Sequence, residues 1–80
     1  MDEIKREYFS IGEVSELVKL SPSVIRHIEG IFSIRVGRNS HGNRRYDTKS
    51  LERLEFIRHL LQDEGFTYRG ALKKYREKYK

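Results

Sequence analysis

The chain has 80 residues, no cysteine and a formal net charge of +5. This length gives one small domain, and the lack of cysteine excludes a disulfide framework or a thiolate metal site and fits a reducing compartment. No apolar run approaches the ~20 residues that span a bilayer, and the first residues lack the apolar core of a signal peptide, so we expect a cytoplasmic protein with no membrane partner.

Basic charge is concentrated in two segments. Residues 26–49 carry six Lys and Arg side chains against two acidic ones, and residues 69–80 carry six against one. Such runs are often only a solvated surface. Here the first run falls in a stretch rich in Gly, Asn and Ser, which favours an anionic partner and nucleic acid in particular.

Residues 10–30 predict two short helices. Ser10 and Glu13 have the spacing of a capping box, and one apolar face follows them, so we expect a helix over 11–18. That face consists of Ile11, Val14, Leu17 and Val18. Ser21 and Pro22 are suited to open a second helix, and Gly30 is suited to end it in a left-handed conformation.

Helices joined this closely form a helix-turn-helix, in which the second helix enters the major groove of DNA. We expect Val24, Ile25 and Ile28 to be buried, which leaves Ser23, Arg26 and His27 nearest the bases. An αα-corner with no role in DNA binding is the alternative.

Residues 34–46 predict a hairpin that we call the wing. Ile34-Arg35-Val36 alternates as a strand does, residues 37–43 have turn chemistry, and Arg44-Arg45-Tyr46 returns as the second strand. Guanidinium groups bind phosphate oxygens through paired hydrogen bonds, so the wing predicts backbone contacts. The candidates are Arg35, Arg38, His41, Asn43, Arg44 and Arg45. A flexible solvated loop is the alternative.

Residues 47–80 predict two supporting helices. Asp47 caps the first, Gly65 ends it, and its apolar stripe is Leu51, Leu54, Ile57 and Leu61. Thr67 caps the second, where Tyr68, Leu72, Tyr75 and Tyr79 share one face and either pack internally or contact a partner subunit.

Residues suited to catalysis are not grouped in the sequence. No Cys–His or Ser–His–Asp arrangement occurs, and His59 with Asp63 offers only two metal ligands. We therefore expect no enzyme activity, no metal and no cofactor.

The order of these stretches resembles the N-terminal DNA-binding domain of MerR-family transcription regulators. The matching stretches are residues 9–18, 20–29, 42–46, 51–58 and 65–67. The resemblance implies one mainly α winged helix-turn-helix domain with about four helices and a small β-hairpin. In this domain residues 10–30 are the helix-turn-helix, 34–46 the wing and 47–80 the helical support.

The resemblance also implies roles for particular residues. Arg26 and Arg44 match the backbone-contacting arginines of the helix and the wing, and the turn with Thr67 and Tyr68 matches a second wing. The family usually has two tyrosines at His27 and Ile28 and another at Asn43. These departures affect the DNA contacts rather than the fold.

The implied function is sequence-specific binding of double-stranded promoter DNA, which the protein distorts. The implied partners are a second subunit, joined through a C-terminal helix to form a homodimer, and RNA polymerase. Two alternatives remain: an architectural or excisionase-like winged-helix DNA binder, and a basic protein-interaction module that uses the aromatic stripe of the last helix. The operator, the effector and the choice between activation and repression are not determined by the sequence.

Overall fold

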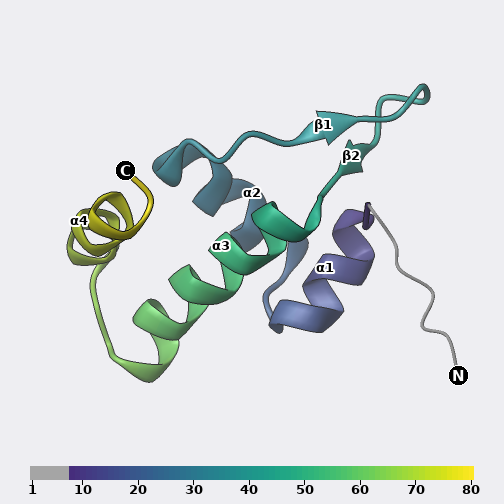
Figure 1. The fold of residues 1–80 in the computed structure, drawn as a ribbon. Coiled ribbons are helices and arrows are strands. Elements are labelled where there is room, and N and C mark those ends of the chain that lie inside the picture. Colours follow the sequence, from purple (N-terminus) through teal and green to yellow (C-terminus); the bar gives the residue numbers. More distant parts are fainter. Residues whose placement is uncertain (1–7) are drawn as a thin grey trace, which may run out of the picture.

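A computed structural model describes residues 8–80, which form helices and one small hairpin (Figure 1). The elements in chain order are α1 (Ile11–Val18), α2 (Pro22–Phe32), β1 (Gly37–Arg38), β2 (Arg44–Arg45), α3 (Thr48–Arg58), a π-helical turn η1 (His59–Asp63) and α4 (Tyr68–Lys78). The predicted fold class, a mainly α winged helix-turn-helix with a small hairpin, is confirmed.

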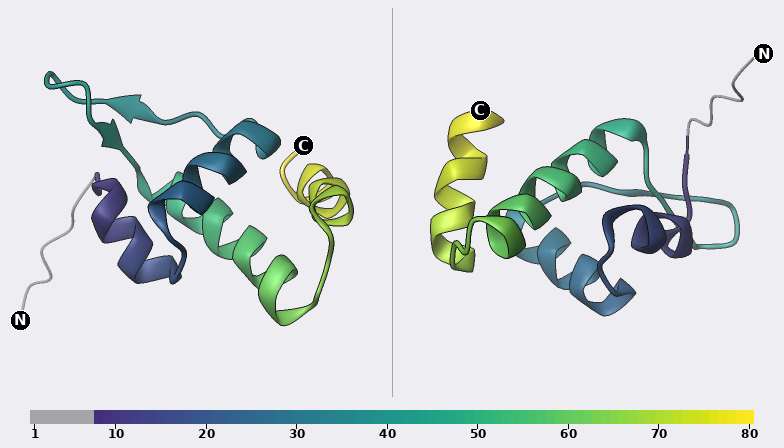
Figure 2. Two further views of the ribbon diagram at one scale, coloured as in Figure 1. Left: turned by 180° about the vertical axis from the view of Figure 1, so that it is seen from behind. Right: turned by 90° about the horizontal axis from the view of Figure 1, so that it is seen from below.

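Helices α1, α2 and α3 form the middle of the molecule, with the hairpin at one end and α4 at the other (Figures 1 and 2). The core between the three helices is made of fully buried aliphatic side chains. These are Val14 and Val18 from α1, Ile25 and Ile28 from α2, and Leu54 and Ile57 from α3. The three helices therefore share one core.

The four predicted helix starts are all confirmed by a capping side chain. Ser10, Ser21, Asp47 and Thr67 each accept a hydrogen bond from the backbone N–H three residues further along. The Glu13 carboxylate also accepts a hydrogen bond from the N–H of Ser10, which completes the capping box. Each cap stabilises its helix by about 1 kcal/mol. Local sequence therefore determines where the helices begin.

Helix α2 is longer than predicted, because Gly30 does not end it. The helix continues to Phe32, and Ser33 takes the left-handed conformation with φ 55°. The apolar face explains the extension: Phe32 lies one turn beyond Ile28 and is only 3% exposed. Burial of that ring outweighs the modest cost of a glycine inside the helix.

The apolar face of α1 is narrower than predicted. Val14 and Val18 are fully buried, whereas Leu17 is 51% exposed. Residues four apart point in the same direction on a helix, and Leu17 lies at the flank of that direction. The prediction that Leu17 belongs to the core is therefore wrong.

The paired part of the wing begins later than predicted. Strand β1 is Gly37–Arg38, and it pairs antiparallel with β2 so that Gly37 faces Arg45 and Arg38 faces Arg44. The same register would place Val36 opposite Tyr46, but Tyr46 exchanges backbone hydrogen bonds of 2.7 and 2.9 Å with Phe9 instead. The predicted strand at Ile34–Val36 is thus replaced by an extended link. We refer to residues 37–45 as the hairpin.

Helix α4 packs across the ends of α2 and α3 through its predicted aromatic stripe. Ala71 and Tyr75 are buried, and the ring of Tyr75 meets that of Phe32 edge-on at 5.3 Å. Tyr79 meets Phe56 of α3 at 5.9 Å. The stripe is therefore used for internal packing, apart from Tyr68 at the start of the helix.

Candidate nucleic-acid interface

The polar side of α2 is exposed while its other side is buried. Ser23, Arg26 and His27 are solvent-exposed, and Ile25 and Ile28 beside them are fully buried. The helix thus presents the three side chains that were predicted to lie nearest the bases. Arg26 makes no ion pair with any other residue in the range 8–80, so its guanidinium is available to an anion.

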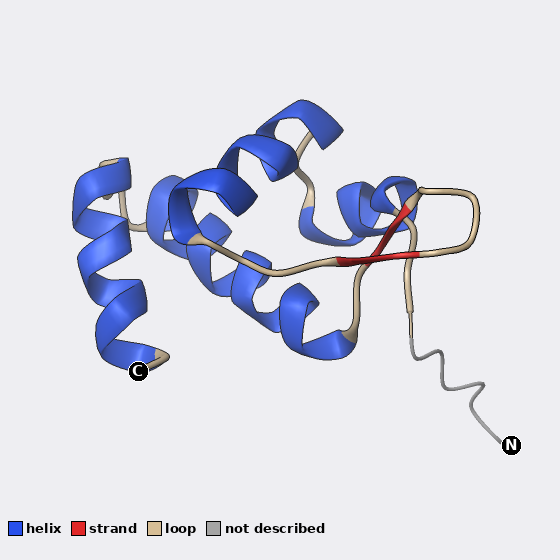
Figure 3. Ribbon diagram, turned by 90° about the horizontal axis from the view of Figure 1, so that it is seen from above, coloured by secondary structure: helices blue, strands red, loops and turns tan. Residues whose placement is uncertain are grey.

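The hairpin turn is held by Asn39. Its side-chain oxygen accepts hydrogen bonds from the backbone N–H of His41 at 2.9 Å and of Asn43 at 3.0 Å. Its backbone carbonyl accepts from the N–H of Gly42, which has φ +83°. Asn side chains commonly order turns in this way, and glycine adopts a positive φ without a steric penalty. The hairpin therefore extends beyond α1 with a defined tip (Figure 3).

The base of the hairpin is tied to α2 through one buried carboxylate. Glu29 is 7% exposed, and its Oε1 accepts a hydrogen bond from Nε of Arg44 at 3.0 Å. Its Oε2 accepts from the hydroxyl of Tyr46, which is fully buried. Burial and the bond to Glu29 raise the pKa of Tyr46 well above its usual range. This cluster, Glu29–Arg44–Tyr46, sets the position of the hairpin relative to α2.

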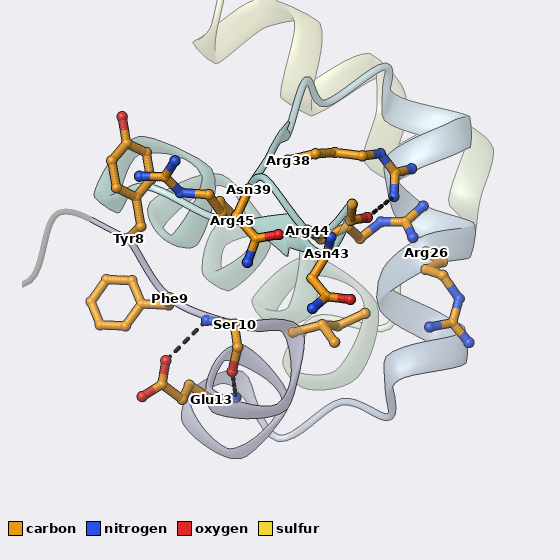
Figure 4. Close-up of a pocket in the computed structure, with 12 residues that line it drawn as sticks. Tyr8, Phe9, Ser10, Glu13, Arg26, Arg38, Asn39, Asn43, Arg44 and Arg45 are labelled. Carbon is orange, nitrogen blue, oxygen red and sulfur yellow. Dashed lines mark hydrogen bonds between the residues drawn. The ribbon is translucent and has the colours of Figure 1, made fainter.

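Arginines gather in a groove between the hairpin, α2 and the start of α1 (Figure 4). The groove has a volume of about 470 Å³. Its basic lining consists of Arg26, Arg38, Arg44 and Arg45, with the amides of Asn39 and Asn43 between them. Arg38 also donates to the carbonyl of Gly42 at 3.1 Å, and the guanidinium of Arg45 lies 3.8 Å from the ring centre of Tyr8. We call this the arginine groove.

The groove brings together five of the predicted contact residues, from two separate elements. Arg26 comes from α2, whereas Arg38, Asn43, Arg44 and Arg45 come from the hairpin. Arg35 is not among them. It precedes the hairpin, and its carbonyl lies 3.4 Å from the hydroxyl of Ser50 in α3. The expectation that Arg35 projects from the wing is therefore wrong, because the strand starts later.

The turn between η1 and α4 approaches the other side of α2. Thr67 caps α4 by accepting from the N–H of Gly70 at 3.1 Å. Tyr68 follows, and its ring meets the imidazole of His27 edge-on, with centroids 5.3 Å apart. The two predicted candidates of this turn thus differ: Thr67 caps the start of α4, and Tyr68 contacts His27 of α2.

Three residues of this interface were not identified from the sequence. Glu29, Asn39 and Tyr46 organise the hairpin without being exposed cations. The signal for Glu29 was present: it lies four residues after Ile25 and one after Ile28, on the face predicted to be buried, where a carboxylate needs a partner. The signal for Asn39 was its place at the start of a glycine-containing turn.

Carboxylates also gather around His59, away from the arginine groove. Nδ1 of His59 lies 2.9 Å from Oδ2 of Asp63, and Nε2 lies 2.7 Å from Oε2 of Glu64. The hydrogen bond to Asp63 is the main cause that raises the pKa of His59. Across residues 8–80 no set of three or more His, Asp and Glu side chains has an arrangement that could hold a metal ion.

The helices of the described chain, residues 8–80, are too short and too polar for any of them to cross a membrane. A model of the MerR HTH family of regulatory proteins matches residues 9–78. No curated protein matches the chain. Because the family match covers nearly the whole sequence and the fold is a winged helix-turn-helix, the protein belongs to the MerR HTH family of regulatory proteins, which bind DNA and regulate transcription.

Proposed function

We propose that the protein binds double-stranded promoter DNA sequence-specifically, with α2 in the major groove and the hairpin along the adjacent backbone or in the minor groove. The observation that carries the proposal is the arginine groove, where cations from α2 and from the hairpin converge beside the exposed face of α2. Recognition helices lie in the major groove with their N-terminal residues against the edges of the bases, and arginines bind phosphates through pairs of hydrogen bonds.

The residues divide into two roles in this proposal. Ser23 and His27 face the bases, while the cations and amides of the arginine groove hold a phosphate strand. Arg44 keeps its Nη groups for phosphate, because Glu29 engages its Nε. Thr67 and Tyr68 lie on the opposite side of α2 from the arginine groove. There the turn between η1 and α4 approaches the next stretch of the DNA backbone.

We further propose that the protein acts as a homodimer on a palindromic site and distorts it for RNA polymerase. In such a dimer the hairpin and α2 of each subunit would contact the duplex at separate points. Bending or untwisting between those points has an energy cost that depends on the sequence, which adds specificity at base pairs that are not touched.

A salt titration of binding tests the proposal. Fluorescence anisotropy with a duplex selected from a palindromic promoter library should show binding that weakens with salt. Arg26→Ala should lower the slope of log K against log salt by about 1, because one phosphate contact is lost.

The matched control is Arg35→Ala, which removes the same charge from an exposed residue outside the arginine groove. Its slope should equal that of the unchanged protein. If Arg26→Ala and Arg35→Ala both have the slope of the unchanged protein, the arginine groove is not the phosphate site. If no duplex shows salt-dependent binding, the proposed function is rejected. Reporter transcription with and without the protein separates a regulator from an architectural DNA binder.

A further inference from the structure

We propose that Tyr68 is a positioning residue for the DNA contact of His27, so that the turn before α4 governs what the recognition helix binds. This inference rests on the proposed function. In this inference the ring of Tyr68 orients His27. The hydroxyl of Tyr68 makes no direct phosphate contact.

The geometry of the ring pair is the first part of the argument. The centroids of His27 and Tyr68 are 5.3 Å apart and their planes are 89° from parallel. Aromatic rings prefer this edge-to-face arrangement because the positive edge of one ring meets the negative face of the other. Both side chains are exposed, Tyr68 by 37%, so the pair lies at the surface rather than in the core.

The backbone on each side of the pair is held by packing. His27 precedes Ile28, which is fully buried in α2. Tyr68 opens α4, which is anchored by buried Ala71 and Tyr75 and capped by Thr67. The turn itself is closed by a 2.9 Å hydrogen bond from Phe66 N–H to the carbonyl of Leu60.

Gly70 shows how closely this turn is packed. A Cβ atom at Gly70 would lie 3.1 Å from Cδ2 of Phe66 and 3.4 Å from Oγ1 of Thr67. The start of α4 therefore has little room to shift relative to the turn. With both backbones fixed, the Tyr68 ring restricts the orientations that the imidazole can adopt.

This restriction matters for binding because an exposed side chain loses rotamer freedom when it docks on a ligand. A side chain that is already oriented loses less, so its contact contributes more affinity. The cost of ordering one such side chain at an interface corresponds to about a two- to tenfold change in an equilibrium constant. Loss of the Tyr68 ring should therefore weaken DNA binding by about this factor.

The test is a double-mutant cycle in the 80-residue chain on the duplex selected above. The variants are Tyr68→Ala, Tyr68→Phe, His27→Ala and His27→Ala with Tyr68→Ala. We expect Tyr68→Ala to weaken binding about two- to tenfold when His27 is present and by less than about 1.5-fold when His27 is absent, because its effect acts through the imidazole. Tyr68→Phe keeps the ring and should bind like the unchanged protein.

Three outcomes would overturn the inference. Equal weakening by Tyr68→Ala with and without His27 would show that Tyr68 acts independently, and equal weakening by Tyr68→Phe and Tyr68→Ala would show that the hydroxyl makes the contact. No weakening by either would show that the ring pair is irrelevant to binding. Failure of the unchanged protein to bind any duplex is a different result, which rejects the proposed function.

Two controls separate positioning from stability. Leu17→Ala removes an exposed apolar side chain from α1, and it should leave binding unchanged. Thermal unfolding by circular dichroism should show that Tyr68→Ala remains folded at the assay temperature, because alanine is a good helix former at an exposed position. The Tyr68→Phe variant gives an independent answer on the role of the hydroxyl.

Discussion

Removal of the Tyr46 hydroxyl should destabilise the fold although no core volume is lost. In Tyr46→Phe the ring remains, but Oε2 of Glu29 loses its hydrogen bond while it stays buried. A hydrogen bond to a charged group contributes about 1.5–3 kcal/mol, and a buried acceptor left unpaired costs a similar amount. We therefore expect a loss of about 2 kcal/mol in the free energy of unfolding. In a domain of this size that loss lowers Tm by about 8–16 °C.

Thermal unfolding followed by circular dichroism measures this effect, and Tyr68→Phe is the matched control. That substitution removes a hydroxyl from an exposed tyrosine, so it should change stability by less than about 0.5 kcal/mol. If Tyr46→Phe unfolds within about 2 °C of the unchanged protein, the buried carboxylate does not hold the hairpin to α2, and the reasoning is refuted.

The pH dependence of the same comparison gives a second check. Burial and the bond to Glu29 raise the pKa of folded Tyr46 above its ordinary value of 10.0. A raised pKa means that the contribution to stability is complete below pH 10 and is lost as the pH rises toward the folded pKa, because only the unfolded phenol ionises freely. The advantage over Tyr46→Phe should be constant from about pH 7 to 9 and should shrink above pH 10.

Substitutions at three other positions have defined outcomes. Ser33→Gly should raise the free energy of unfolding by about 0.5–1 kcal/mol in a urea titration, because Ser33 has φ 55°; Ser33→Ala should bring no gain, since it keeps the Cβ. Gly42→Ala should lower it by about 1–2 kcal/mol, because Gly42 has φ +83° at the hairpin turn; an unchanged midpoint would contradict a rigid hairpin. His59→Gln should lower Tm most between pH 3.8 and 6.5, because the pKa of His59 is raised and that of Asp63 is lowered. This difference should decline as the pH rises above 6.5 through the raised pKa, and a pH-independent difference would argue against the ion pair.

The sequence by itself determined the helix starts and most of the core. Each helix start is set by a capping hydrogen bond that spans only three residues, so it can be predicted from local sequence. The caps are Ser10, Ser21, Asp47 and Thr67. The stripe of α3 was equally clear, since Leu54 and Ile57 repeat with the helical period and both are fully buried. The cations of the hairpin could also be named, because they lie in a stretch with turn chemistry.

The tertiary structure decided the features that depend on residues distant in sequence. Gly30 lies inside α2 because Phe32 is buried against Tyr75, which is more than 40 residues away in the sequence, so no local pattern predicts this contact. The first strand starts at Gly37 because Tyr46 pairs with Phe9, so Arg35 is left outside the arginine groove.

The interface itself shows the same division. The arginines were visible in the sequence, but the bond that places Arg44 beside α2 comes from Glu29, which lies 15 residues away. The contact between His27 and Tyr68 joins two helices whose closeness depends on the packing of α4. Local chemistry thus supplies the side chains that can bind DNA, and burial of the shared core decides which of them meet.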